Sequence, residues 1–195
     1  RLTGPTMAYF IAEGYAYTRS VKKYARRLAI FAVISWIPFT VFEYGRLPVY
    51  KLNGNYTFDF SPGVIYTLFL ALLAIWVWDK GTMMEPQKKA IIAFLCILSI
   101  WGDWPIFDIL YAMCFFCYRD DEKKKWSTYT LISVCSFVFG GFGIWGIYQL
   151  GVFLVPLLLH YIYNGKAGSK KPIHKWFFYV FYPLHLLVLG LLKIL

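Results

Sequence analysis

The strongest constraint on this chain is a series of apolar stretches, each about as long as a membrane is thick. A membrane-spanning helix needs about 20 mostly apolar residues. Only 15% of the 195 residues are charged, against about 25% in a typical soluble domain, so we exclude a soluble globular enzyme and a disordered chain. The sequence predicts an all-α, polytopic integral membrane helix bundle that forms one domain over residues 1–195. The eight predicted helices cover residues 5–18, 27–44, 62–79, 88–102, 104–118, 127–142, 145–163 and 174–193.

The charged residues are arranged as expected for a membrane protein. The chain has a net charge of +10, and sixteen of its twenty Lys and Arg residues fall in loops on one side of the predicted bundle. These loops are 18–27, 79–89, 119–125 and 164–175. Such an asymmetry places the basic side in the cytoplasm. Orientation in a lipid bilayer therefore explains the charge, and we do not expect nucleic acid binding.

The connections on the opposite side differ in length. Residues 102–105 and 140–143 are rich in Gly or contain Pro, which predicts tight turns between antiparallel helices. The longer segment 45–61 contains Asn, Gly and aromatic residues, and we expect a loop that covers or lines an external opening. The chain starts at Arg1 and not at Met, and we expect a further helix upstream.

Ionisable side chains inside a membrane span are costly and usually functional. Glu13 lies near the basic end of the first predicted helix, where it takes part in a site or pairs with Arg27 or another nearby cation. His185 lies some ten residues into the last predicted helix, two residues after Pro183. A neutral imidazole at this depth suits a general base, an oxyanion donor or an interhelical hydrogen bond. Asp108 is expected to hydrogen-bond near the turn at 102–105.

Other polar residues in the spans have simpler alternatives. Ser and Thr inside membrane helices commonly bond to their own helix or to a neighbouring one; this reading competes with a polar pocket for Thr18, Ser35 and Thr67. Cys114 and Cys117 have the spacing of a redox or metal motif, but no second pair of Cys or His residues lies nearby. We interpret them as packing residues and expect no metal site.

Several motifs together resemble one family. They are Glu13-Gly14-x-x-x-Thr18-Arg19-x-x-x-Lys23-Tyr24-x-x-Arg27, Tyr66-Thr67-Leu68, Asn164-Gly165-Lys166-x-Gly168 and Phe181-Tyr182-Pro183-Leu184-His185. In this order they resemble the TraX family, which is named for a pilin N-acetylase. The resemblance implies a multi-span acyltransferase that takes an acyl group from cytoplasmic acyl-CoA in a bacterial inner membrane. It also implies an Asp-His pair on a helix upstream of this chain. Gly63 and Asp103-Trp104-Pro105 depart from the family pattern, so the substrate is not carried over from pilin.

Acyl transfer from a thioester needs a base, donors for the oxyanion and cations for the phosphates of coenzyme A. We therefore predict three groups of residues. The catalytic residues are His185 and Glu13. The residues that bind acetyl-CoA are Arg27, Lys23, Lys166 and Tyr24. The residues of the substrate pocket are Thr18, Ser35, Thr67 and Tyr182.

The predicted function is acyl transfer, most simply acetyl transfer from acetyl-CoA, to an amine or hydroxyl on a protein, peptide or glycan at or across the membrane. Two alternatives remain. A transporter or permease would use buried Glu13 and His185 in a proton or solute pathway, but it predicts inverted repeats, which the sequence does not show. The other alternative is a membrane assembly protein without catalysis.

Overall fold

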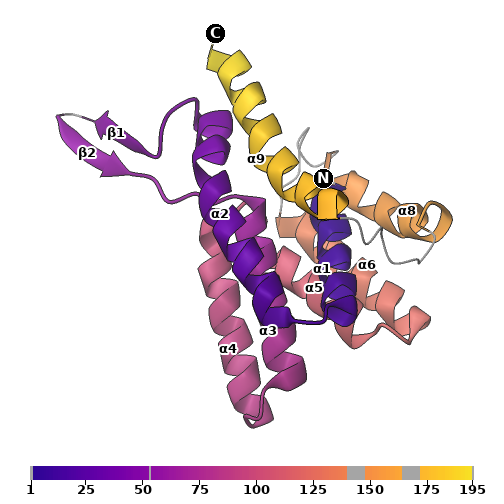
Figure 1. Cartoon of the computed structure of the whole chain (residues 1–195). Coiled ribbons are helices and arrows are strands. Elements are labelled where there is room, and N and C mark those ends of the chain that lie inside the picture. Colours follow the sequence, from indigo (N-terminus) through magenta and orange to yellow (C-terminus); the bar gives the residue numbers. More distant parts are fainter. Residues whose placement is uncertain (1, 53, 140–147, 164–171, 195) are drawn as a thin grey trace.

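The computed structural model describes residues 2–52, 54–139, 148–163 and 172–194, and most of them are helical (Figure 1). The prediction of a helical fold is confirmed. The helices are α1 (Thr3–Tyr17), α2 (Val21–Tyr44), α3 (Val64–Lys80), α4 (Glu85–Leu98), α5 (Phe107–Cys117), α6 (Glu122–Phe139), α8 (Val155–Tyr161) and α9 (Pro172–Ile194), with short 3-10 helices η1 (Ser99–Trp101) and η2 (Leu150–Leu154).

Several helix boundaries differ from the prediction by three to six residues; α6, for example, begins at Glu122 and not at the predicted 127. α2 begins six residues earlier than the predicted 27, because Ser20 caps it: the Ser20 side chain accepts a hydrogen bond from the Lys23 backbone N–H at 3.4 Å. The predicted helix 145–163 is represented, in its described part, by η2 followed by the seven-residue α8. Here the backbone leaves α-helical geometry ahead of Pro156, which stands near the start of α8.

The core lies around α3, which packs against α1, α2, α4 and α5. Four neighbouring positions of α3 have no exposed surface: Ala71, Leu72, Ala74 and Ile75. The two alanines let neighbouring backbones approach closely. α3 is thus the central helix of the bundle.

α2 and α9 lie side by side and run in the same direction. Near their starts, the rings of Phe31 and Tyr179 are 4.9 Å apart. Near their ends, the Lys193 ammonium group donates to the backbone oxygens of Phe42 and Glu43, both at 3.2 Å. A parallel pair is the arrangement expected for the second and the eighth of eight alternating helices.

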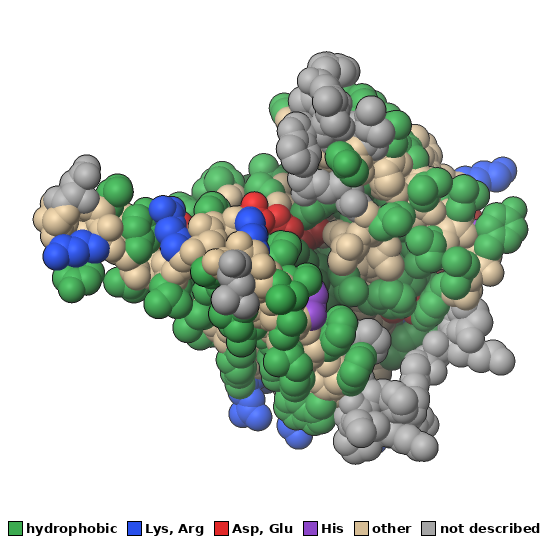
Figure 2. Space-filling model, turned by 90° about the horizontal axis from the view of Figure 1, so that it is seen from above, with side chains coloured by type: hydrophobic (Ala, Val, Ile, Leu, Met, Phe, Trp, Pro, Cys, Tyr) green, Lys and Arg blue, Asp and Glu red, His purple; other side chains and the backbone are tan. Residues whose placement is uncertain are grey.

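The outer surface is apolar over much of its area, and Figure 2 shows hydrophobic side chains across most of the face seen from above. On α2, for example, the side chain of Val33 is 69% exposed, and those of Ile34 and Ile37 are also exposed. Within the described residues, one helix, α2, is long and apolar enough to cross a membrane, and shorter apolar helices cover Phe107–Cys117, Leu150–Tyr161 and Tyr179–Ile194. The eight membrane spans remain a prediction.

The segment 45–61 is more ordered than the loop we expected. Gly45, with φ of 65°, ends α2 in the left-handed conformation, and its N–H bonds the Val41 oxygen at 3.0 Å. The chain then forms an antiparallel hairpin of β1 (Val49–Leu52) and β2 (Asn55–Phe58). The turn predicted at 102–105 is present between η1 and α5, whereas the one at 140–143 lies outside the described residues.

Candidate functional site

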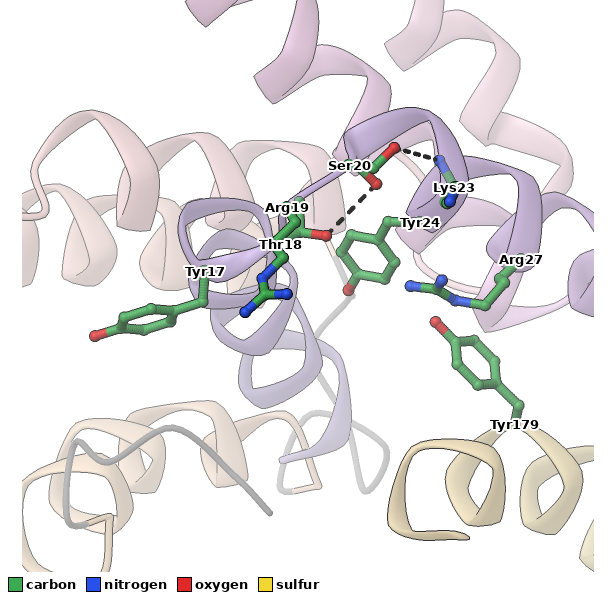
Figure 3. A pocket seen from close by; sticks show the side chains of 9 residues that line it. Tyr17, Thr18, Arg19, Ser20, Lys23, Tyr24, Arg27 and Tyr179 are labelled. Atoms are coloured by element: carbon green, nitrogen blue, oxygen red, sulfur yellow. Dashed lines mark hydrogen bonds between the residues drawn. The ribbon is translucent and has the colours of Figure 1, made fainter. Parts of the chain in front are cut away.

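A pocket of about 480 Å³ opens where α1 ends and α2 begins, with α9 as its third wall (Figure 3). We call it the basic pocket. It is lined by Gly14, Tyr17, Thr18, Arg19, Ser20, Lys23, Tyr24, Arg27 and Tyr179. Four of the ten predicted site residues, Thr18, Lys23, Tyr24 and Arg27, are thus brought together.

The electrostatic character of the basic pocket is strongly positive. Arg19, Lys23 and Arg27 contribute three cations, and no Asp or Glu is among the described residues that line it. The pocket also lies at the first turn of α2, where unpaired backbone N–H groups and the helix dipole add positive potential. The arrangement is suited to bind an anion with several negative charges.

Arg27 is the least exposed of these three cations. Figure 3 shows its guanidinium group between the side chains of Tyr24 and Tyr179, and its central carbon is 5.7 Å from the centre of the Tyr24 ring. Its Nε atom is buried and has no hydrogen-bond acceptor within the described part of the chain. An unpaired buried donor is costly, and an anionic ligand in the pocket would supply an acceptor.

Gly14 allows Tyr24 to form the pocket wall. A Cβ atom at position 14 would lie 3.0 Å from the Tyr24 hydroxyl oxygen and 3.2 Å from the nearest ring carbon. A side chain there would therefore press on the ring. Glycine at this position permits the close approach of α1 to α2.

Glu13 does not line the basic pocket. Its carboxylate pairs with Arg119, which follows α5, at 3.6 Å, and the Glu13 side chain is only 15% exposed. The Arg119 guanidinium also lies 5.3 Å from the centre of the Tyr17 ring, which lines the pocket. Glu13 therefore pairs with a nearby cation other than Arg27, which is one of the two interpretations made from the sequence. Arg119 in turn connects Glu13 to Tyr17 in the wall of the basic pocket.

His185 lies outside the basic pocket as well. It follows Tyr179 by six residues, which is about 9 Å along α9. Its Nδ1 atom lies 2.9 Å from the Phe181 backbone oxygen, and the two rings stack with a centroid distance of 4.9 Å. Since a carbonyl oxygen can only accept, Nδ1 carries the proton, and Nε2 of the neutral ring is the atom that can take one up.

Thr67 lies in the first turn of α3, at the opposite end of the bundle, and Tyr182 of α9 lies beside it. The Thr67 hydroxyl is 2.6 Å from Oδ2 of Asp108, and the Tyr182 hydroxyl lies near the backbone N–H of Val64. Asp108 has no exposed surface. The expected hydrogen bond of Asp108 near the turn is therefore present, but its partner is the Thr67 side chain from another helix.

The two remaining predicted residues are not part of either group. Ser35 is fully buried in α2, and its hydroxyl has no hydrogen-bond partner in the described ranges. Lys166 lies outside the described residues.

A second pocket, of about 150 Å³, lies at the far end of α1. It is lined by Asp103, Trp104, Pro105, Phe107, Ser136, Phe139 and Gln149. Gly4 packs against the Trp104 ring, and Gly14 lines the basic pocket ten residues later, which is about 15 Å along the helix. The two pockets therefore lie near opposite ends of α1.

Comparison with known proteins gives a consistent result. Residues 1–193 match the model of the family described as "TraX protein". The chain is also 30% identical over 203 residues to the "Probable fimbrial assembly protein FimC, serogroup H1" of Dichelobacter nodosus. The match covers 97% of this chain and 79% of that protein. No solved structure matches the chain.

Proposed function

Since the chain belongs to the TraX family, we propose that it is a multi-span membrane acyltransferase that takes an acetyl group from acetyl-CoA bound in the basic pocket. The acceptor is an amine or hydroxyl of a protein, peptide or glycan at or across the membrane. The proposed location is the bacterial cytoplasmic membrane, with the basic pocket on the cytoplasmic side.

Three features support a membrane bundle. The described helices follow the eight predicted apolar stretches, and basic residues gather in alternate loops. Large apolar side chains are exposed along α2 and α9, for example Val33 and Leu192. In water, a surface of this kind marks an interaction site, and lipid is the partner that can cover two long helices at once.

The observation that carries the proposal is the set of Arg19, Lys23 and Arg27 around one pocket. Coenzyme A carries a pyrophosphate and a further phosphate, and three cations beside a helix N-terminus match such a ligand. The unpaired Nε of Arg27 fits this role because it would donate to a phosphate oxygen. The aromatic rings of Tyr17, Tyr24 and Tyr179 offer apolar faces for the remaining part of the donor.

The protein's own groups then have defined tasks. The acceptor nitrogen or oxygen attacks the thioester carbonyl, and its proton passes to a base. The C–S bond then breaks, and the base gives the proton to the leaving sulfur, so that coenzyme A is released as the thiol. His185 is the proposed base, because its Nε2 atom can accept that proton. Glu13 holds Arg119 against Tyr17 and so shapes the entrance of the donor pocket.

A second candidate function is assembly of pili without catalysis. The relative from Dichelobacter nodosus is named a fimbrial assembly protein, which favours a role connected with pili for this chain too. The two functions are compatible if the acceptor is a pilus subunit. A transporter has no comparable support among the described residues.

The test is release of free coenzyme A thiol from acetyl-CoA by the full-length protein in lipid nanodiscs, with amine and hydroxyl acceptors supplied in turn. We expect acceptor-dependent thiol release that His185→Ala lowers by about 10²-fold or more, as for loss of a general base. His160→Ala, in which an exposed histidine is replaced, is the matched control and should keep the rate. Absence of thiol release with every acceptor would leave the assembly role as the better reading.

A further inference from the structure

The β1–β2 hairpin extends sideways from the helices (Figure 1). Among the described elements, each strand of the hairpin packs extensively only on the other strand. Tyr56 is 82% exposed and Phe58 60% exposed, and Val49 and Leu52 are also more than half exposed. An isolated two-stranded hairpin is marginally stable in water, and its open edges promote aggregation. This hairpin therefore requires a surface to cover it.

The pairing register separates the two faces of the hairpin. Val49 pairs with Phe58 and Lys51 with Tyr56, so these four side chains share one face, which we call the aromatic face. Tyr50 pairs with Thr57 and Leu52 with Asn55, and these share the other face. The aromatic face is apolar near the helices and ends in a lysine at the tip.

Contacts at the base of the hairpin show which way the aromatic face turns. The Phe58 ring lies 5.0 Å from the ring of Trp36 on α2. Trp36 precedes Tyr44, the last residue of α2, by eight residues, or about 12 Å along the helix. The aromatic face thus turns back along α2, toward the middle of the bundle.

The base of the opposite face is closed by an arginine. The Arg46 guanidinium lies 3.8 Å from the centre of the Tyr50 ring and pairs with Asp59 at 3.3 Å. This face therefore carries charged and polar groups where the aromatic face carries Val49 and Phe58.

We propose that the hairpin lies in the headgroup region of the outer leaflet of the cytoplasmic membrane, with its aromatic face against phospholipid. α2 is the one described helix long enough to span a membrane, and it ends two residues before Arg46, so the hairpin emerges at the level of the membrane surface. Tyr and Trp side chains favour this interface, and the aromatic face carries Tyr56. Lys51 is the one charged residue in the described parts of the strands, and its ammonium group meets lipid phosphates. The inference rests on the membrane bundle proposed above.

The experiment uses the full-length protein in phospholipid nanodiscs with the photoreactive residue benzoylphenylalanine at one position at a time. Position 56 samples the aromatic face, and position 57 on the opposite face of the same strand is the matched control. Position 33, exposed on α2, reports whether the bundle itself contacts lipid. After irradiation, intact-protein mass spectrometry detects a phospholipid adduct, and gel electrophoresis detects a cross-linked second copy.

We expect a phospholipid adduct at positions 33 and 56, and severalfold less at position 57. An adduct at 33 without one at 56, or equal adducts at 56 and 57, would overturn the hairpin inference and leave the membrane bundle intact. A cross-linked dimer at 56 in place of lipid would also overturn it, in favour of a second copy. No lipid adduct at any position would overturn both the hairpin inference and the bundle.

Discussion

The hydroxyl oxygen of Thr67 lies 2.6 Å from Oδ2 of Asp108, and both side chains are fully buried between α3 and α5. The same hydroxyl lies 2.8 Å from the Val64 backbone oxygen. A hydroxyl has one proton to donate, and a carbonyl oxygen can only accept. The Thr67 hydroxyl and the Val64 oxygen are both satisfied when Asp108 carries a proton on Oδ2 and donates it to Thr67, which then donates to Val64. Oδ1 of Asp108 is buried and has no hydrogen-bond partner among the described residues.

This arrangement predicts that Asp108→Asn changes the free energy of unfolding by less than about 1 kcal/mol, because the amide nitrogen donates to Thr67 as the protonated acid does. Thr67→Val removes the partner of a buried carboxyl oxygen and should cost about 1–3 kcal/mol. Chemical unfolding in detergent micelles measures both. If Asp108→Asn costs as much as Thr67→Val, the carboxyl group is not acting as a donor.

Gly14 should control the width of the basic pocket. Gly14→Val places a branched side chain where even a Cβ atom comes within 3.0 Å of the Tyr24 hydroxyl. We expect acetyl-CoA affinity to fall by about tenfold, or about 1.4 kcal/mol. Ala16→Val, on the exposed side of the same helix, should leave the affinity unchanged. Equal affinity in both variants would mean that Tyr24 does not form the donor pocket.

The Glu13–Arg119 pair gives a test of what Glu13 does. Because Arg119 is 39% exposed, solvent screens the pair, and we expect a coupling energy of about 0.5–1 kcal/mol in a double-mutant cycle. The exchange variant Glu13→Arg with Arg119→Glu should restore both stability and thiol release if Glu13 only shapes the pocket. If stability returns but thiol release does not, the Glu13 carboxylate itself takes part in the chemistry.

The start of α6 should be sensitive to acid. The Glu122 side chain accepts from Lys125, and from the Trp126 indole at 2.7 Å; the Lys125 bond above all holds the pKa of Glu122 below its usual value. A lowered pKa means that this stabilisation is present above the unfolded-state pKa and is lost as the pH falls through the folded-state pKa. The protection of the amides of residues 122–126 against hydrogen exchange, relative to the intrinsic exchange rate at each pH, should therefore fall at acidic pH. Glu122→Gln should show the lower protection at neutral pH already. If the protection in that variant depends on pH as it does in the wild type, the assignment is refuted.

The fold was largely predictable because long apolar stretches and short basic loops allow few alternatives to a helical bundle. The early start of α2 was not predictable from hydropathy, because Lys22, Lys23 and Arg26 make its first turns look like a basic loop. The Ser20 cap nevertheless starts the helix at Val21. The hairpin was missed for a related reason: its side chains are exposed on both faces, so the strands show no clear alternation of apolar and polar residues.

The site was predictable where its residues are neighbours in sequence. Thr18, Lys23, Tyr24 and Arg27 lie close together in sequence around the start of α2, and they meet in one pocket. Tyr179 comes from α9, and no spacing along the chain indicates that it meets Arg27. The same holds for Thr67 and Asp108, which are 41 residues apart, and for the pairing of Glu13 with Arg119.

The most direct test of the central claim is binding of acetyl-CoA to the full-length protein, measured by calorimetry in detergent for the wild type, Arg27→Ala and Arg26→Ala. Arg27 lines the basic pocket, whereas Arg26 is exposed beside it and does not. We predict saturable binding that Arg27→Ala weakens by at least about tenfold, or about 1.4 kcal/mol, while Arg26→Ala retains nearly full affinity. No binding by the wild type, or equal losses in the two variants, would contradict a specific donor site in the basic pocket.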